Sequence, residues 1–150
     1  MRPRVTNGTI FTADGSSFAD VLVDGETIAR IGSELAANGI NADETIDAAG
    51  RWLMPGALDV HTHMELPFGG TFASDDFATG TAAAAWGGTT TIVDFAVQSY
   101  GQTLRQGLDQ WHKKAEGKAH IDYGFHMIVR EINDGILREI DTLVGEGVPS

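Results

Sequence analysis

The sequence predicts an α/β fold with a parallel sheet, preceded by a small unit of β-strands. Up to about Leu53, short β-favouring runs alternate with turn residues, a pattern typical of strands. After Pro55 a strand followed by a helix recurs at a spacing of about 30 residues, as in βαβ units. Alternating strands and helices indicate a parallel sheet. A His-x-His pair, His61 and His63, ends the first of these later strands, where (β/α)8 barrels place their chemistry.

The N-terminal unit is expected to contain short strands joined by turns. Asp24-Gly25 lies between two of the β-favouring runs, and this dipeptide is a strong hairpin signal because glycine tolerates a positive φ. The expected strands are residues 4–11, 19–23, 27–31 and 44–46.

The second part is expected to contain three helices between its strands. A residue of Ser74-Asp75-Asp76 can cap a helix over residues 77–86, which Gly87-Gly88 ends. Thr103 and Gln106 have the spacing of a capping box. The strands of this second part should begin near Ala57, Thr89 and Ile121, and a fourth strand should begin at Val148. The second helix should bury Leu104, Leu108, Trp111 and Ala115; the third, capped by Asn133 or Asp134 and ended by Gly145, should bury Ile136, Ile140, Leu143 and Val144.

Three strand–helix units cannot close a barrel. A (β/α)8 barrel needs eight strands and typically about 250 residues, so more than half of such a barrel would lie beyond Ser150. We therefore expect an N-terminal piece of a longer enzyme, with residues 1–54 in the strand-rich unit and 55–150 in the first three βα units and the start of the fourth strand. A complete open α/β domain is the alternative, which the interruption at Val148-Pro149-Ser150 disfavours.

The composition narrows the class of protein. The chain has 150 residues, and 42% of them are hydrophobic, which is enough for a buried core. It has no cysteine, so His and carboxylates remain as metal ligands. A formal charge of -11 argues against nucleic-acid or anionic-lipid partners. Because neither a signal peptide nor a membrane-spanning run is found, no membrane partner and a cytoplasmic location are expected.

His61 and His63 are the candidate metal ligands. Side chains two residues apart on a strand point to the same side, so both imidazoles can reach one ion, at about 2.0–2.1 Å for each Zn–N bond. Pro55-Gly56 marks a turn before the short strand and puts the pair at its carboxyl end. The alternative is a pair of strand-end histidines that hydrogen-bond to the backbone.

Five segments together resemble the dihydropyrimidinase and D-hydantoinase family, which are cyclic amidohydrolases of the amidohydrolase superfamily. The first reads Pro-Gly-x-Leu-Asp-x-His-x-His and is similar to the first metal motif of that superfamily. The resemblance implies a TIM-like (β/α)8 barrel, with residues 1–54 as the N-terminal part of a small β-sandwich that strands from the far C-terminus complete. The segments are residues 55–63, 64–71, 85–91, 114–117 and 122–127.

The resemblance also implies a binuclear site, usually of zinc, with His61 and His63 as ligands of the more buried ion. A hydroxide that bridges two divalent metal ions attacks the carbonyl of a cyclic amide, because the cations lower the pKa of the shared water and polarise the carbonyl. Further His ligands, a general-base Asp and a lysine carboxylated to a metal-bridging carbamate are expected after Ser150. No catalytic residue is therefore expected within residues 1–150 apart from the metal ligands.

Asp59, Leu66 and Phe68 lie close to this motif in the sequence. Asp59 shares the side of the histidines if strand geometry holds, and it could orient a metal-bound imidazole; an interior hydrogen bond or salt bridge is the alternative. Leu66 and Phe68 fall on the first βα loop, which in the resembling enzymes forms a hydrophobic gate over the substrate's exocyclic substituent. Ordinary loop anchoring is the alternative, and Glu65 is expected to be a solvated charge.

Structural roles are assigned to the other polar candidates. Asp94 ends the second strand of the parallel sheet and is interpreted as structural. His126 lies within the third strand and is expected to be a hydrogen-bonded interior histidine rather than a third metal ligand. His112 and His120 are expected to face solvent.

The sequence thus predicts a hydrolase of C–N bonds in cyclic amides, which opens dihydropyrimidine or 5-substituted hydantoin rings to N-carbamoyl amino acids. Dihydroorotases and allantoinases share the His-x-His motif, but the charged substrate of the dihydroorotases would need a cationic pocket, and the apolar segment 66–68 fits a neutral or hydrophobic substrate better. A non-catalytic dihydropyrimidinase-like assembly protein, which would lack a complete metal-ligand set, is the other alternative. The family resemblance implies a homotetramer.

Overall fold

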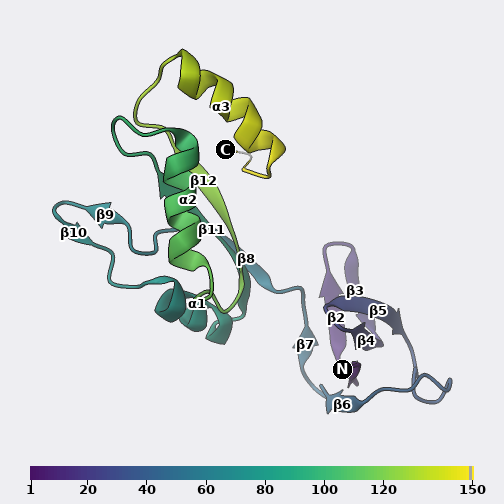
Figure 1. Cartoon of the computed structure of the whole chain (residues 1–150). Coiled ribbons are helices and arrows are strands. Elements are labelled where there is room, and N and C mark those ends of the chain that lie inside the picture. Colours follow the sequence, from purple (N-terminus) through teal and green to yellow (C-terminus); the bar gives the residue numbers. More distant parts are fainter. Residues whose placement is uncertain (149) are drawn as a thin grey trace. The chain divides into compact units, whose positions relative to one another are not determined.

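The computed structural model describes residues 1–148 and Ser150, and the chain forms two compact units, Met1–Pro55 and Gly56–Ser150 (Figure 1). The sequence-based boundary lay one residue earlier, between residues 54 and 55. Each unit has its own sheets and its own buried side chains.

The first unit consists of two small sheets. Its strands are β1 (Pro3–Thr6), β2 (Thr9–Thr12), β3 (Gly15–Phe18), β4 (Asp20–Asp24), β5 (Thr27–Gly32), β6 (Glu44–Asp47) and β7 (Trp52–Leu53). The larger sheet has the order β5-β4-β1-β6, in which β1 pairs antiparallel with β4 and parallel with β6. The smaller sheet has the order β3-β2-β7. That these sheets are part of a β-sandwich stays a prediction.

The single strand expected over residues 4–11 was wrong, because this segment forms β1 and β2, which belong to different sheets. Asn7 stands at the break with a φ of 61°, in the left-handed region that asparagine tolerates better than most residues. The hairpin expected at Asp24-Gly25 is confirmed: β4 and β5 pair antiparallel, and Gly25 has a φ of 61°. The strands β3 and β7 were not expected, since one is rich in serine and the other has two residues.

The second unit contains a three-stranded parallel sheet. Its strands are β8 (Ala57–Thr62), β11 (Thr89–Val97) and β12 (Asp122–Ile128), in the order β12-β11-β8. Between β8 and β11 lie a hairpin, β9 (Pro67–Phe68) and β10 (Thr71–Phe72), and the helix α1 (Phe77–Trp86). The helices α2 (Leu104–Ala115) and α3 (Asp134–Gly145) follow β11 and β12 (Figure 1). The three expected βα units are confirmed, and the closed barrel stays a prediction.

The predicted capping residues begin all three helices. The carboxylate of Asp76 accepts a hydrogen bond from the N–H of Thr79, and Thr103 forms a reciprocal capping box with Gln106. Asn133, rather than Asp134, caps α3 and accepts hydrogen bonds from two backbone N–H groups. These caps satisfy N–H groups that the first turn of a helix leaves without partners.

One face of the parallel sheet forms the core with the helices. We call it the helix face: on β11 it carries the buried residues Ile92, Asp94 and Ala96, which alternate with partly exposed ones. The expected buried face of α2 is confirmed, since all of its apolar members are buried. Burial of a leucine-sized side chain is worth about 1.5–3 kcal/mol. The expectation for α3 was wrong at Val144, which is 52% exposed at the end of the helix.

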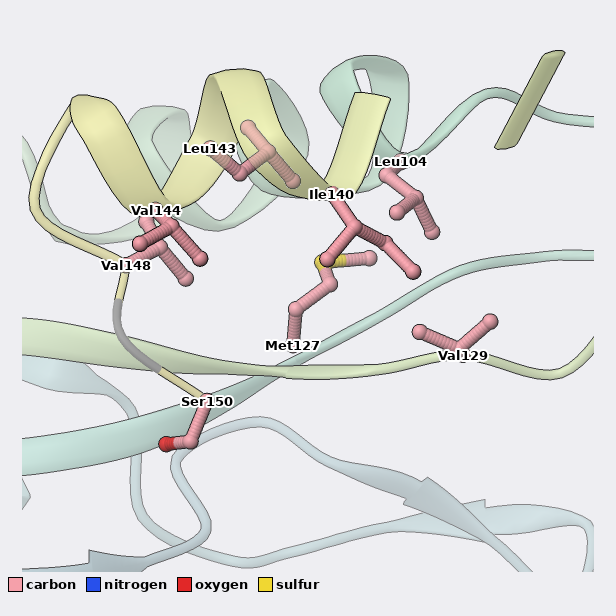
Figure 2. A pocket seen from close by; sticks show the side chains of 8 residues that line it. All are labelled: Leu104, Met127, Val129, Ile140, Leu143, Val144, Val148 and Ser150. Carbon is pink, nitrogen blue, oxygen red and sulfur yellow. The ribbon is translucent and has the colours of Figure 1, made fainter. Parts of the chain in front are cut away.

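The chain returns to the sheet at its last described residue. The carbonyl oxygen of Ser150 accepts a hydrogen bond from the N–H of Met127 in β12, at 2.7 Å. Figure 2 shows Ser150 beside an apolar cavity of about 110 Å³ to which α2, α3 and β12 contribute side chains. The fourth strand expected from Val148 falls partly on Pro149, which lies outside the described residues. No helix within residues 1–148 is long and apolar enough to cross a bilayer.

Candidate metal centre

His61 and His63 project from the end of β8 onto Phe95 of the neighbouring strand β11. Their ring centroids lie 5.0 Å apart, nearly edge to face. The centroid of the Phe95 ring is 4.6 Å from that of His61 and 5.1 Å from that of His63. Phe95 alternates with Asp94 along β11, so these rings lie on the sheet face opposite the helix face. We call this second face the histidine face.

A β-bulge in β8 lies between Asp59 and Thr62 and includes His61. Asp59 pairs with Ile92, but Thr62 pairs with Asp94, so β8 has one residue more than β11 between these pairs. The carboxylate of Asp59 accepts a hydrogen bond from the backbone N–H of His61 at 3.1 Å. Asp59 was expected either to orient an imidazole or to make an interior hydrogen bond or salt bridge. The hydrogen bond it makes in the structure is with the backbone N–H of His61 and is exposed.

Asp94 holds the backbone around His63 from the helix face. Its carboxylate accepts hydrogen bonds from the N–H of Met64 at 2.7 Å and from the hydroxyl of Thr62 at 3.0 Å. Its side chain is completely buried. The structural interpretation of Asp94 is therefore confirmed, and two of the residues that bind its carboxylate are the chain neighbours of His63.

His126 belongs to the histidine face but has both ring nitrogens in hydrogen bonds. Its Nε2 is 3.0 Å from the carbonyl oxygen of Val60, and its Nδ1 contacts the hydroxyl of Ser150. Its ring centroid is 4.7 Å from that of Phe95. The expectation that His126 is hydrogen-bonded is confirmed, but these hydrogen bonds are exposed and the residue is only partly buried; that His126 is not a metal ligand stays a prediction. The side chains of His112 and His120 are exposed, as expected.

The loop after His63 builds an apolar wall beside the histidines. The strands β9 and β10 form a tight hairpin whose turn residues, Gly69 and Gly70, have φ values of 60° and 82°, which suits glycine. Leu66 and Phe68 share a cavity of about 450 Å³ with His63. Phe72, which the sequence reasoning missed, lines the same cavity; its signal was the second apolar run directly after Gly-Gly. The other lining residues are Thr71 and Ala73.

Lys114 reaches this loop from α2. Its Nζ donates a hydrogen bond to the carbonyl oxygen of Glu65 at 3.2 Å and lies 3.9 Å from the ring centroid of Trp111. Partial burial lowers the pKa of the Lys114 ammonium, although the carboxylates of Glu65 and Asp94 oppose that shift. Glu65 has a φ of 50°, a conformation that costs a non-glycine residue on the order of 1–3 kcal/mol unless its surroundings enforce it.

Glu65 itself was expected to be a solvated charge, and this was wrong. Glu65 is only partly exposed, and one of its carboxylate oxygens lies 3.9 Å from Nζ of Lys118. The sequence could not show this contact, because Lys118 follows the end of a helix that begins almost forty residues later.

The donor set suits a metal ion but is incomplete. Two imidazoles at one strand end offer nitrogen donors of the kind that bind zinc and other first-row metals. Within residues 1–148 and Ser150, no group of three or more His, Cys, Asp or Glu side chains is arranged to hold a metal ion. His61 and His63 therefore offer two suitable donors, and the described residues do not supply a complete set of metal ligands.

The chain is similar to known enzymes over almost its whole length. It is 54% identical to a D-hydantoinase of Streptomyces coelicolor over 151 residues, which is 99% of this chain and 32% of that protein. It is 47% identical to a D-hydantoinase of Geobacillus stearothermophilus, over 97% of this chain and 30% of that protein. The crystal structure of a dihydropyrimidinase from Brevibacillus agri matches 99% of this chain and 32% of its own, with a TM-score of 0.93 and 52% identity.

No family model matches the chain. The chain spans about a third of the length of the curated relatives it matches.

Proposed function

The chain is a homologue of D-hydantoinases and dihydropyrimidinases over about a third of their length, and from this premise we propose that the full-length protein is a metal-dependent hydrolase of cyclic amides. It opens dihydropyrimidine or 5-substituted hydantoin rings to N-carbamoyl amino acids. The observation that supports this function best is the pair of imidazoles at the end of β8, which converge over Phe95 beside an apolar cavity.

His61 and His63 would hold the more buried of two divalent ions, for which zinc is our proposal. When bound, such ions lower the pKa of the water they share and polarise the scissile carbonyl. The chain's own contribution is to keep both imidazoles on one face. The bulge at Asp59 and the ring of Phe95 serve this purpose, because they fix the backbone and the ring positions from two sides.

The contacts of Ser150 support a further ligand just beyond it. Its carbonyl pairs with β12 and its hydroxyl meets His126 on the histidine face. Side chains alternate along a strand, so the residue two positions after Ser150 would share that face. We propose that a carboxylated lysine stands there, since a carbamate can bridge two cations that an ammonium would repel. Further His ligands and the general-base Asp would follow later in the chain.

The apolar cavity beside His63 would receive the exocyclic substituent of the substrate. Leu66 and Phe68 were the residues expected for this role, and Phe72 joins them on the hairpin. An apolar wall selects substituents by shape and keeps water away from the reacting amide. This favours a neutral or hydrophobic ring substituent over the charged carboxylate of dihydroorotate and the polar ureido group of allantoin.

Two alternatives remain distinguishable by experiment. A dihydroorotase or allantoinase would turn over dihydroorotate or allantoin faster than hydantoin or dihydrouracil. A non-catalytic assembly protein would bind no metal and open none of these rings. A homotetramer and a cytoplasmic location are part of the proposal; light scattering of the full-length protein tests the first, and cell fractionation tests the second.

The test is ring opening by the full-length protein with dihydrouracil and hydantoin, before and after removal of divalent metal. We expect turnover of at least one ring, loss of turnover with a chelator and its return with zinc. If neither ring opens in the presence of metal, the proposed function is wrong. The matched control is the same protein treated with chelator already saturated with zinc.

A further inference from the structure

The segment that carries His63 is held at both ends by charged side chains on the helix face. Before it, the hydroxyl of Thr62 binds the carboxylate of Asp94, and after it the N–H of Met64 binds the same oxygen. One residue further, the carbonyl of Glu65 accepts a hydrogen bond from Lys114. His63 itself makes none of these contacts and is free to present its ring to the other face.

The charges of Asp94 and Lys114 lie in a buried and a partly buried position, where they need partners. Asp94 is completely buried, and the ammonium of Lys114 is held near it in a partly buried site over Trp111. Isolated buried charges are costly unless they are hydrogen-bonded or paired. Here each charge uses backbone groups of the segment 62–65 as partners, and Lys114 is also attracted by the carboxylates of Glu65 and Asp94.

The hydrogen bond from Lys114 to Glu65 helps to hold Glu65 in a strained backbone conformation. A non-glycine residue keeps a φ near 50° only where its surroundings enforce it, and two contacts do so here. The N–H of Glu65 donates to the carbonyl of Asp75 at 2.9 Å, and its carbonyl accepts from Lys114. The turn that directs the chain away from His63 is thereby fixed.

We propose that Asp94 and Lys114 are positioning residues which clamp the segment 62–65 and so hold His63 in place for metal binding. This inference rests on the proposed function, because it assigns the two charges to the same metal site. Neither side chain is placed to touch substrate or metal, since Asp94 lies on the helix face and Lys114 reaches the loop from α2. Residues that orient metal ligands typically change metal affinity or activity by about 10–100-fold when they are removed.

Lys114→Met is the informative variant, because it removes the hydrogen bond while keeping a long apolar side chain over Trp111. Lys113→Met is the matched control: it is the same substitution one residue earlier on α2, at an exposed position. Two quantities are measured on the full-length protein. The first is the hydrogen-exchange rate of the peptide that contains residues 62–65. The second is the dissociation constant for zinc by competition with a chromogenic chelator.

We expect Lys114→Met to exchange faster in this peptide and to bind zinc about 10-fold more weakly, with kcat recovering at saturating zinc, while Lys113→Met matches the wild type. Unchanged exchange in Lys114→Met overturns the clamp. Faster exchange with unchanged zinc affinity overturns its positioning role. If the wild-type protein binds no zinc, the proposed function fails, and the exchange comparison still decides whether the clamp exists.

Discussion

The carboxylate of Asp94 in β11 accepts a hydrogen bond from the backbone N–H of Met64 at 2.7 Å, across 30 residues of sequence. Met64, which directly follows His63, is thus held by a side chain of the neighbouring strand β11. The same carboxylate also accepts the hydroxyl of Thr62. One buried acidic side chain therefore determines where the second half of the His-x-His motif lies.

Asp94→Ala is expected to destabilise the protein strongly. It leaves the N–H of Met64 and the hydroxyl of Thr62 without this acceptor; both hydrogen bonds are partly buried, and full burial of an unsatisfied group would cost about 1–3 kcal/mol. Asp94→Asn should cost less, since its amide oxygen still accepts. Urea denaturation of the three full-length proteins measures the difference, and equal stabilities for Asp94→Ala and the wild type would contradict the assignment.

Phe68→Ala is expected to change substrate preference without changing metal content. Phe68 is 81% exposed and lines the cavity beside His63, so its loss should alter packing around the substrate more than folding. The ratio of kcat/KM for bulky against small 5-substituted hydantoins should shift by about 10-fold or more. Phe18→Ala, which removes an exposed phenylalanine from the first unit, is the control. If both variants rank the substrates in the same order, Phe68 anchors the loop and does not select the substrate.

Gly56→Ala is expected to disturb the start of β8. A Cβ at this position would lie 2.6 Å from Cβ of Thr90 and closer still to the rest of that side chain, so the backbone must move. Overpacking of this kind costs about 1–3 kcal/mol. Gly145→Ala is the control, since no atom lies within 4 Å of the added Cβ. Thermal unfolding compares them, and similar midpoints would contradict the close approach of β8 and β11.

The cap of α1 should make stability depend on pH in the acid range. The hydrogen bond from the N–H of Thr79 holds the pKa of the Asp76 carboxyl below its ordinary value of 3.8. A lowered pKa stabilises the folded state above pH 3.8, and this contribution is lost as the pH falls through the folded-state pKa. The stability advantage of the wild type over Asp76→Asn should therefore shrink as the pH decreases below 3.8. An advantage that does not change with pH would show that the charge has no part in the cap.

Features that depend on short stretches of sequence could be predicted. The helix caps Asp76, Thr103 and Asn133 and the hairpin at Gly25 follow from residues within one turn of each other. The placement of His61 at the end of a short strand has the same origin. These features need no knowledge of what packs against them.

Features that depend on distant contacts could not be predicted in detail. The break in residues 4–11 arises because β1 and β2 pair in different sheets. Lys114 donates a hydrogen bond to Glu65, which lies 49 residues earlier in the sequence. Nothing in the sequence around either residue predicts this contact. The bulge that frees the N–H of His61 for Asp59 appears only in the register between β8 and β11. The sequence therefore revealed the candidate ligands but not the residues that hold them.

The metal content of the full-length protein tests the central claim most directly. We predict that the wild type binds two divalent ions per chain, and that a variant with both His61→Ala and His63→Ala loses the more buried ion together with ring-opening activity. Its fold should be kept, because strand-end residues contribute less packing than the core. Elemental analysis after exhaustive dialysis gives the stoichiometry. The same metal content in the wild type and the double variant would contradict the account.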